Sequence, residues 1–94
     1  MPKTVTPESF PTVSFVDGEP QGGVLKIETF EGGQIRFRVK SDAPEEVHVH
    51  GFDISKSVAA GGTATIDFKA DMQGIYEAEM EVSGVPIAEI QVNP

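Results

Sequence analysis

Hydrophobic and polar residues alternate with a period of two over most of the chain, which is the pattern of half-buried β-strands. The clearest case is residues 34–40, where Ile35, Phe37 and Val39 share one face and the other positions are polar or basic. Shorter alternating runs carry their apolar residues at these positions: Val13 and Phe15; Leu25 and Ile27; Val47 and Val49; Ala64, Ile66 and Phe68; Tyr76, Ala78, Met80 and Val82; and Ala88, Ile90 and Val92. No run has a sustained period of 3.6, although residues 55–60 allow one helical turn.

Glycine- and proline-rich segments separate these runs, as turns between strands require. Residues 31–33, Glu-Gly-Gly, supply the turn chemistry of a hairpin between the strand near Leu25 and the strand at 34–40. The small residues at 57–62 predict a loop. Seven or eight short strands joined in this way predict an all-β fold, either a β-sandwich or a small barrel.

The length of 94 residues indicates a single domain. Residues 1–11 contain three prolines and few apolar residues, so we expect an extended lead-in with an edge strand from Val5, followed by a domain over 12–94. Arg36, Arg38 and Lys40 lie opposite the apolar face of their strand and predict a solvated basic sheet face.

Composition excludes several classes of function. With seven basic and fifteen acidic residues, the formal charge of −8 disfavours nucleic acid and favours cations or basic protein partners. No apolar run approaches the length of about 18 residues that membrane insertion needs. Because the sequence has no cysteine, it has no disulfide, no thiolate nucleophile and no thiolate metal ligand. We expect a monomer.

Catalytic motifs are also lacking. The serines and threonines have no nucleophile-elbow context, and neither histidine has a context that indicates a triad. Paired acids such as Glu45 and Glu46 are typical of a solvated surface in so acidic a chain. The sequence therefore predicts a protein that is not an enzyme.

Both histidines of the chain, His48 and His50, lie two residues apart on one predicted strand, beside several carboxylates. Residues at i and i+2 of a strand point to the same face with Cβ atoms roughly 7 Å apart, so two imidazoles can coordinate one ion if the chain bends locally. Imidazole suits copper, zinc or nickel. This pair is the candidate metal site.

Which face the histidines use depends on a change of alternation at Gly51. Val47 and Val49 place odd positions in the core, whereas Phe52 and Ile54 place even positions there. A β-bulge at Gly51 would bring all four apolar residues inward and leave the histidines on the outer face. An inward orientation of the histidines is the alternative.

The strand around Tyr76 places glutamates on its own outer face, at positions 77, 79 and 81. If this strand is the neighbour of the histidine strand, imidazoles and carboxylates meet across the sheet. We then expect a metal site of His48 and His50 with Glu81 or Glu79 as further ligands. The alternative is a solvated patch of histidines and acids that binds no metal.

The order of motifs resembles the cupredoxins, the family of Greek-key β-sandwiches that carry copper, and specifically the bacterial extracytoplasmic cupredoxin-like domains. The resemblance covers residues 12–93 and rests on these segments: Ile35 to Asp42, Glu46 to Asp53, Gly61 to Ala70, Gly74 to Glu77, and Ile90 to Val92. It implies a Greek-key β-sandwich and a periplasmic or extracellular location, with the signal or anchor not present in this chain.

The resemblance also implies which copper ligands are missing. The segment His50-Gly51-Phe52 matches the position of the family's first copper ligand, but Met80 stands where the ligand cysteine would be and Ser83 where the second histidine would be. Some relatives without the cysteine keep a His-x-His-Gly pair and carry a further histidine where this chain has Glu81. The same string resembles a motif of multicopper oxidases, which need about ten histidines, so no oxidase activity is implied.

Two functions follow from this comparison. One is a non-enzymatic cupredoxin-like module without a type 1 copper site that binds copper(II) or zinc weakly through His48 and His50. The other is a metal-free β-sandwich that serves as a structural or protein-interaction domain. Met72 and Met80 are conceivable soft ligands for copper(I), but the alternation assigns Met80 to the core.

Overall fold

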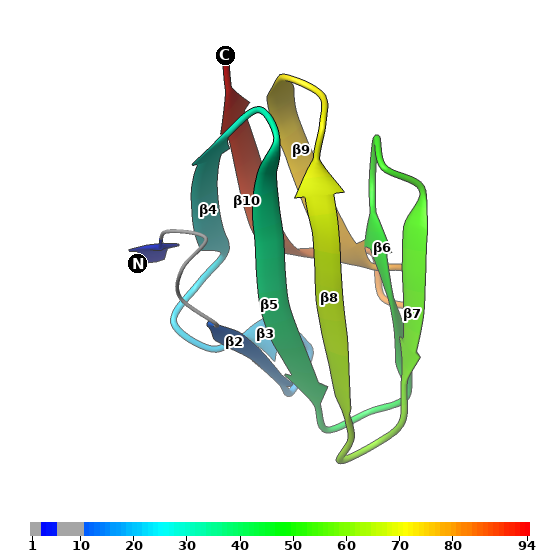
Figure 1. Cartoon of the computed structure of the whole chain (residues 1–94). Coiled ribbons are helices and arrows are strands. Elements are labelled where there is room, and N and C mark those ends of the chain that lie inside the picture. The colour runs from blue at the N-terminus through cyan, green and yellow to red at the C-terminus, as the bar shows by residue number, and fades with distance from the viewer. Residues whose placement is uncertain (1–2, 6–10) are drawn as a thin grey trace.

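In a computed structural model of the chain, which describes residues 3–5 and 11–94, two β-sheets face each other (Figure 1). The strands in chain order are β1 Lys3–Val5, β2 Thr12–Val16, β3 Glu19–Pro20, β4 Leu25–Phe30, β5 Gly33–Ser41, β6 Glu45–Val49, β7 Ile54–Val58, β8 Thr63–Ala70, β9 Gly74–Met80 and β10 Val85–Asn93. Every regular element of the described ranges is a strand, and eight of them have five residues or more. The predicted all-β sandwich is confirmed.

The two sheets are both mixed. One has six strands in the order β1-β4-β10-β9-β6-β7, and the other has four in the order β3-β2-β5-β8. The chain therefore passes from sheet to sheet several times, and strands that are distant in sequence become neighbours. Among these pairs, β6 lies beside β9 and β10 beside β4.

The core lies between the sheets and is built from the inward positions of the alternating runs. Its largest fully buried side chains are Phe37, Ile27, Ile35, Ile66, Met80, Ile87, Ile90, Val39, Val47 and Val49. Burying this apolar surface is the main favourable contribution to folding. The prediction for Val82 was wrong, because β9 ends at Met80 and the chain turns away, which leaves Val82 75% exposed.

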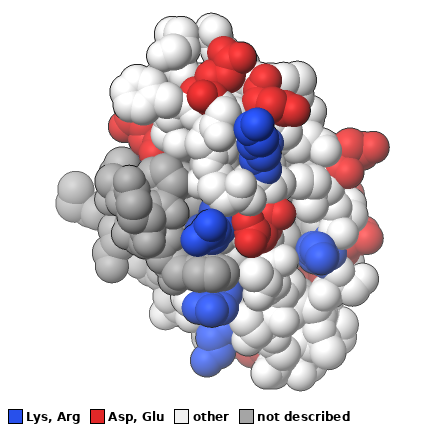
Figure 2. All heavy atoms as spheres, viewed as in Figure 1, with Lys and Arg blue, Asp and Glu red and all other residues white. Residues whose placement is uncertain are grey.

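The basic face predicted for residues 34–40 is present. Arg36, Arg38 and Lys40 are exposed on β5, and Arg36 lies 3.7 Å from Asp67 of the neighbouring β8. Figure 2 shows lysine and arginine side chains along the front of the molecule, over the four-stranded sheet. The opposite outer face belongs to the six-stranded sheet.

The turn at residues 31–33 does not form the predicted hairpin. β4 pairs with β1 and β10 in one sheet, whereas β5 pairs with β2 and β8 in the other. The turn is tied to both sheets, since Glu31 N–H donates to Asn93 O at 2.7 Å and Gly32 N–H donates to Ala70 O at 2.7 Å. Local turn chemistry predicted the reversal correctly, but long-range strand pairing assigned the two strands to different sheets.

Residues 50–53 form a turn, and not the predicted bulge within one long strand. β6 ends at Val49, the chain reverses, and β7 begins at Ile54, which pairs with Val49. Two residues of the turn have positive φ, Gly51 at 88° and Asp53 at 55°. The reversal still brings Phe52 and Ile54 against the core, which is the outcome that the bulge was invoked to explain.

The small residues after this turn do not begin a loop at position 57, and residues 55–60 do not form a helical turn. Residues 55–58 belong to β7, which ends at Val58 and is the outermost strand of its sheet. Val58 is buried while the serines beside it are exposed, so pairing with β6 and burial of one face outweigh the low strand propensity of serine.

An aromatic cluster fills the core beside the 50–53 turn. Phe52 packs against Phe68 and Tyr76, with ring centroids 4.7 and 4.6 Å apart, and the Tyr76 hydroxyl donates to Gln73 O. The Tyr76 ring lies directly over Gly51, in the space that a Cβ atom would need. The turn is therefore closed by a side chain of β9, a strand that is distant from it in sequence.

The N-terminal prediction falls largely on residues 1–2 and 6–10, outside the described residues. Lys3–Val5 forms β1, which pairs in parallel with β4 at the end of the six-stranded sheet. Among the described residues, no helix has the length and apolar character that crossing a membrane would require.

Substitution of Gly51 by alanine is expected to destabilise the fold. The new Cβ would occupy a positive-φ position and overlap the Tyr76 ring, and the backbone strain alone costs about 1–3 kcal/mol. Gly32→Ala is the matched control, because Gly32 has a φ of 91° but open space where a Cβ would lie. In urea unfolding, Gly51→Ala should lose more free energy of unfolding than Gly32→Ala. Equal losses would contradict packing of Tyr76 against the turn.

Candidate metal centre

The strand that carries His48 is paired with the strand that carries Glu79, and His50 and Glu81 are the first residues after these two strands. β6 and β9 are antiparallel, and in their register Val47 faces Met80, His48 faces Glu79 and Val49 faces Ala78. Two backbone bonds extend the ladder, from His50 N–H to Glu77 O and from Glu81 N–H to Glu46 O. The condition that the sequence left open, whether these strands are neighbours, is met.

Alternation along both strands places the histidines and glutamates on the outer face of the six-stranded sheet. Val47, Val49, Ala78 and Met80 are fully buried on the inner face, so His48 and Glu79 between them point the other way. Glu81 and His50 follow the two strands and lie on the same side, because they contact His48 and Glu79. His48 and Glu79, at the centre, have side chains 22% and 21% exposed, whereas His50 and Glu81 are 45% and 41% exposed. The inward alternative for the histidines is wrong.

The closest contacts between the two strands are diagonal. His48 directly faces Glu79 in register, yet its Nδ1 lies 2.8 Å from Oε1 of Glu81, two residues further along the chain and just past the end of β9. His50 Nε2 is hydrogen bonded to Oε1 of Glu79, again two residues from its direct partner. In both pairs the glutamate lies two residues further along the chain than the residue directly opposite the histidine, so the two contacts run parallel to each other between the strands. The imidazole centroids are 4.5 Å apart with an interplanar angle of 65°.

One nitrogen of this group lacks a hydrogen bond. His48 Nδ1 is buried, and its approach to Glu81 is close enough for an ion pair but does not meet hydrogen-bond geometry with any described residue. Buried polar atoms are nearly always hydrogen bonded, and an exception commonly marks a water or ion site. An imidazole nitrogen without a hydrogen bond beside a carboxylate oxygen is an environment that a divalent cation can occupy.

The four predicted ligands come together in a space close to the size of a coordination shell. One ligand atom from each of His48, His50, Glu79 and Glu81 lies within 4.8 Å of all the others. Metal–ligand bonds of about 2.1 Å place ligand atoms about 3.4 Å apart in a tetrahedral site and about 4.2 Å apart across a square plane. Small rotations of the two more exposed side chains would therefore close the group around one ion.

Glu45 is a buried residue that the sequence assigned to the solvated surface. The residue is 7% exposed, and Oε1 accepts N–H bonds from Val82 at 3.1 Å and from Glu46 at 3.3 Å. Because Val82 follows Glu81, this carboxylate holds the backbone directly after Glu81, in the turn that follows β9. The Glu45-Glu46 pair had no signal for this role, since the partner is 37 residues away.

The positions that the cupredoxin resemblance gives to the missing copper ligands do not contribute to this group. Met80 is fully buried on the inner face, as the alternation predicted, and Ser83 lies exposed in the turn after β9. Beside the 50–53 turn, the partly buried rings of Phe52, Phe68 and Tyr76 pack against the core. The potential ligands therefore lie outside the sandwich.

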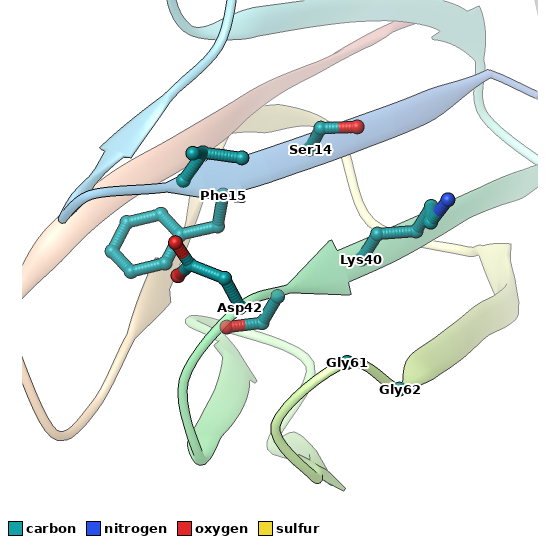
Figure 3. Close-up of a pocket in the computed structure, with 8 residues that line it drawn as sticks. Ser14, Phe15, Lys40, Asp42, Gly61 and Gly62 are labelled. Atoms are coloured by element: carbon teal, nitrogen blue, oxygen red, sulfur yellow. The ribbon is translucent and has the colours of Figure 1, made fainter.

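A separate hollow of about 310 Å³ lies near the end of β5 (Figure 3). Several of its polar groups already have partners: the Asp42 carboxylate accepts Asp17 N–H at 3.0 Å, and the N–H groups of Gly61 and Gly62 donate to backbone carbonyls. A ligand pocket needs several unpartnered polar groups that converge. This hollow therefore offers less chemistry than the histidine and glutamate group.

No family model matches the sequence, and no curated protein is similar enough in sequence to match it. Solved structures match by fold. The metal-binding domain of the Cu(I)-exporting P-type ATPase CopA of Streptococcus pneumoniae, solved with Cu(I), has a TM-score of 0.73 at 11% identity and covers 100% of this chain and 97% of that one. A copper binding protein solved by NMR in its apo form has a TM-score of 0.69 at 10% identity, with 99% and 98% covered.

Larger copper proteins contain the same fold as a part. The laccase-like multicopper oxidase CueO of Ochrobactrum sp. has a TM-score of 0.71 at 15% identity, and the match covers 99% of this chain and 29% of that one. The chain spans 41% and 39% of two further multicopper oxidases. At these identities the likeness concerns the fold alone, and the chain has the cupredoxin-like fold that its motifs predicted.

Replacing Glu45 by alanine is expected to lower the free energy of unfolding by about 1.5–3 kcal/mol, because a buried charged acceptor for two N–H groups is lost. Glu46→Ala is the matched control, since Glu46 is exposed and an ordinary surface substitution costs no more than about 0.5 kcal/mol. Glu45→Gln keeps an acceptor oxygen and should fall between the two. Equal unfolding midpoints in urea for the two alanine variants would contradict the role given to Glu45.

Proposed function

We propose that this cupredoxin-like chain is a non-enzymatic metal-handling module without a type 1 copper site. It binds copper(II) or zinc through His48 and His50, and Glu79 and Glu81 complete the ligand set. The observation that carries the proposal is the convergence of four ligand atoms within 4.8 Å of one another, on two paired strands and the residues that directly follow them. The buried Nδ1 of His48, which has no hydrogen bond, supports it.

The ligand types support copper(II) and zinc among the common cations. Imidazole nitrogen is a good ligand for both ions, and carboxylate oxygen is a hard ligand that contributes negative charge. Two carboxylates neutralise a divalent ion, which lowers the cost of removing it from water. Calcium and magnesium prefer all-oxygen shells of six or more ligands, which this group does not offer.

Electrostatics on this face also favour a cation. Among the residues that the structure describes, Glu46, Glu77 and Glu89 are further acids of β6, β9 and β10 that lie on the same outer face. Lys26 of β4, which also lies on this face, is 3.7 Å from Glu89 and offsets that one charge. The surface around the ligands is therefore negative and raises the local concentration of cations.

The copper proteins of the same fold are a further support. The CopA domain and the apo copper binding protein are each nearly matched in length by this chain, so a cupredoxin-like unit of this size occurs as a copper-binding unit. We extend the proposal to a location outside the cytoplasm, which the resemblance to extracytoplasmic cupredoxin-like domains implies.

A metal-free interaction domain is the second candidate, and the segregation of charge favours it. Four basic residues, Arg36, Arg38, Lys40 and Lys69, lie on the outer face of the four-stranded sheet, whereas acids dominate the outer face of the six-stranded sheet. Such a surface could bind a basic protein through its acidic side. Metal binding separates the two candidates.

Calorimetric titration with copper(II), and separately with zinc, tests the proposal. We expect wild type to bind one ion, and His48→Ala and His50→Ala each to weaken binding by at least tenfold, because each removes a ligand for which no described side chain substitutes. Glu28→Gln, on the same outer face but on β4, is the matched control and should bind as wild type does. If wild type and both histidine variants bind equally weakly, the module is metal-free.

The copper-loaded protein is expected to show only weak visible absorption. Intense blue colour arises from a thiolate bound to copper, and the sequence has no cysteine. A visible spectrum recorded with one equivalent of copper(II) checks this, with metal-free protein as the reference. An intense blue band would contradict the ligand set.

A further inference from the structure

We infer that the histidine and glutamate group discriminates between oxidation states of copper: it holds copper(II) and releases the metal when an external donor reduces it to copper(I). This inference rests on the proposed function, because it specifies the cargo of the same site. It goes further by naming the oxidation state that is bound and the event that ends binding.

The first argument is the kind of atom that the group presents. Two imidazole nitrogens and two carboxylate oxygens converge, and none of the four residues offers sulfur. Copper(I) is a soft ion that favours thiolate and thioether ligands, whereas carboxylate oxygen suits harder ions. Two of the four ligands would thus contribute much to copper(II) and little to copper(I).

The second argument is the position of the methionines that the structure describes. Met80 is fully buried on the inner face of the sheet, opposite Val47, so its thioether lies on the other side of the backbone from the group. Met72 precedes β9, and the strand from Gly74 to Glu79 alone spans about 17 Å. When bound copper(II) is reduced to copper(I), neither of these two sulfurs can therefore replace a carboxylate as a ligand while the strands keep their arrangement.

The third argument is charge. With two bound carboxylates a copper(II) ion is neutralised, whereas a copper(I) ion leaves one negative charge in excess. The neighbouring Glu46 and Glu77 are exposed acids on the same face and oppose that excess charge. Coulomb interaction therefore favours the doubly charged ion, and it acts in the same direction as ligand type.

The release step transfers one electron. An external one-electron donor such as ascorbate is oxidised, the bound copper(II) ion becomes copper(I), and the histidines and glutamates keep their oxidation state. No covalent bond of the protein forms or breaks, and the metal–ligand bonds are lost as copper(I) passes to a soft acceptor. The group would thus take up oxidised copper and deliver reduced copper.

The test compares the two oxidation states on the same protein. Copper(II) is titrated by calorimetry, and copper(I) is measured anaerobically by competition with bicinchoninate. We expect the dissociation constant for copper(I) to be at least a hundredfold larger than that for copper(II). At 59 mV per tenfold change, this ratio places the reduction potential of the bound copper about 120 mV below that of the free copper(II)/copper(I) couple. Ascorbate with bicinchoninate should strip the copper-loaded protein.

Two variants assign the discrimination to this group. The double variant Glu79→Gln and Glu81→Gln keeps both imidazoles but removes the two carboxylate charges. It should therefore weaken copper(II) binding more than copper(I) binding, so that the two dissociation constants become more similar. Met72→Leu removes an exposed thioether, 43% exposed, that could hold copper(I) elsewhere on the surface. The ratio of the copper(I) to the copper(II) dissociation constant in Met72→Leu therefore describes the histidine and glutamate group without a contribution from Met72.

The outcomes are distinguishable. If Met72→Leu binds copper(I) as tightly as copper(II), or if the double glutamine variant keeps the wild-type ratio, the inference is overturned while the proposed metal function stands. If copper(II) itself does not bind, the proposed function fails and the inference fails with it.

Discussion

The antiparallel register of β6 and β9 is the constraint on which the rest of the candidate site depends. In this register Val47 faces Met80 and Val49 faces Ala78 on the inner side, and burial of these four side chains makes any other register costly. A slip of one residue would turn the apolar set outward and the histidines inward. The hydrophobic core therefore determines where the imidazoles and carboxylates lie, although it contacts them only through the backbone.

Two further features hold this register at its ends. Near the 50–53 turn, the Tyr76 ring packs over Gly51 and against Phe52, which joins β9 to the β6–β7 hairpin. At the other end, the buried carboxylate of Glu45 accepts the N–H of Val82 and joins β6 to the chain beyond β9. The ligand-bearing residues lie between these two contacts, so an ion would meet a surface that is already arranged.

The cupredoxin-like fold and the proposed metal chemistry use different sides of the same sheet. The interior holds an aromatic cluster and a buried Met80, and it presents no thiolate. The outer face holds two imidazoles and several carboxylates in a negative field. A site of this kind is more accessible to solvent and harder in its ligands than a buried site with sulfur, which suits exchange of an ion better than its permanent retention.

The sequence by itself determined most of the strands, the inner positions of most of them, the fold class and the four candidate ligands, because a period of two is a local property that each strand displays without its partners. His48, His50, Glu79 and Glu81 could be named in this way, since the alternation at Val47 and Val49 and at Ala78 and Met80 places all four on outer faces. Only the tertiary structure decided which strands are neighbours, and hence that the four meet. For the same reason it separated β4 from β5 into different sheets, replaced a bulge at Gly51 by a turn and buried Glu45. Each of these outcomes depends on groups distant in sequence, whose contacts no local pattern records.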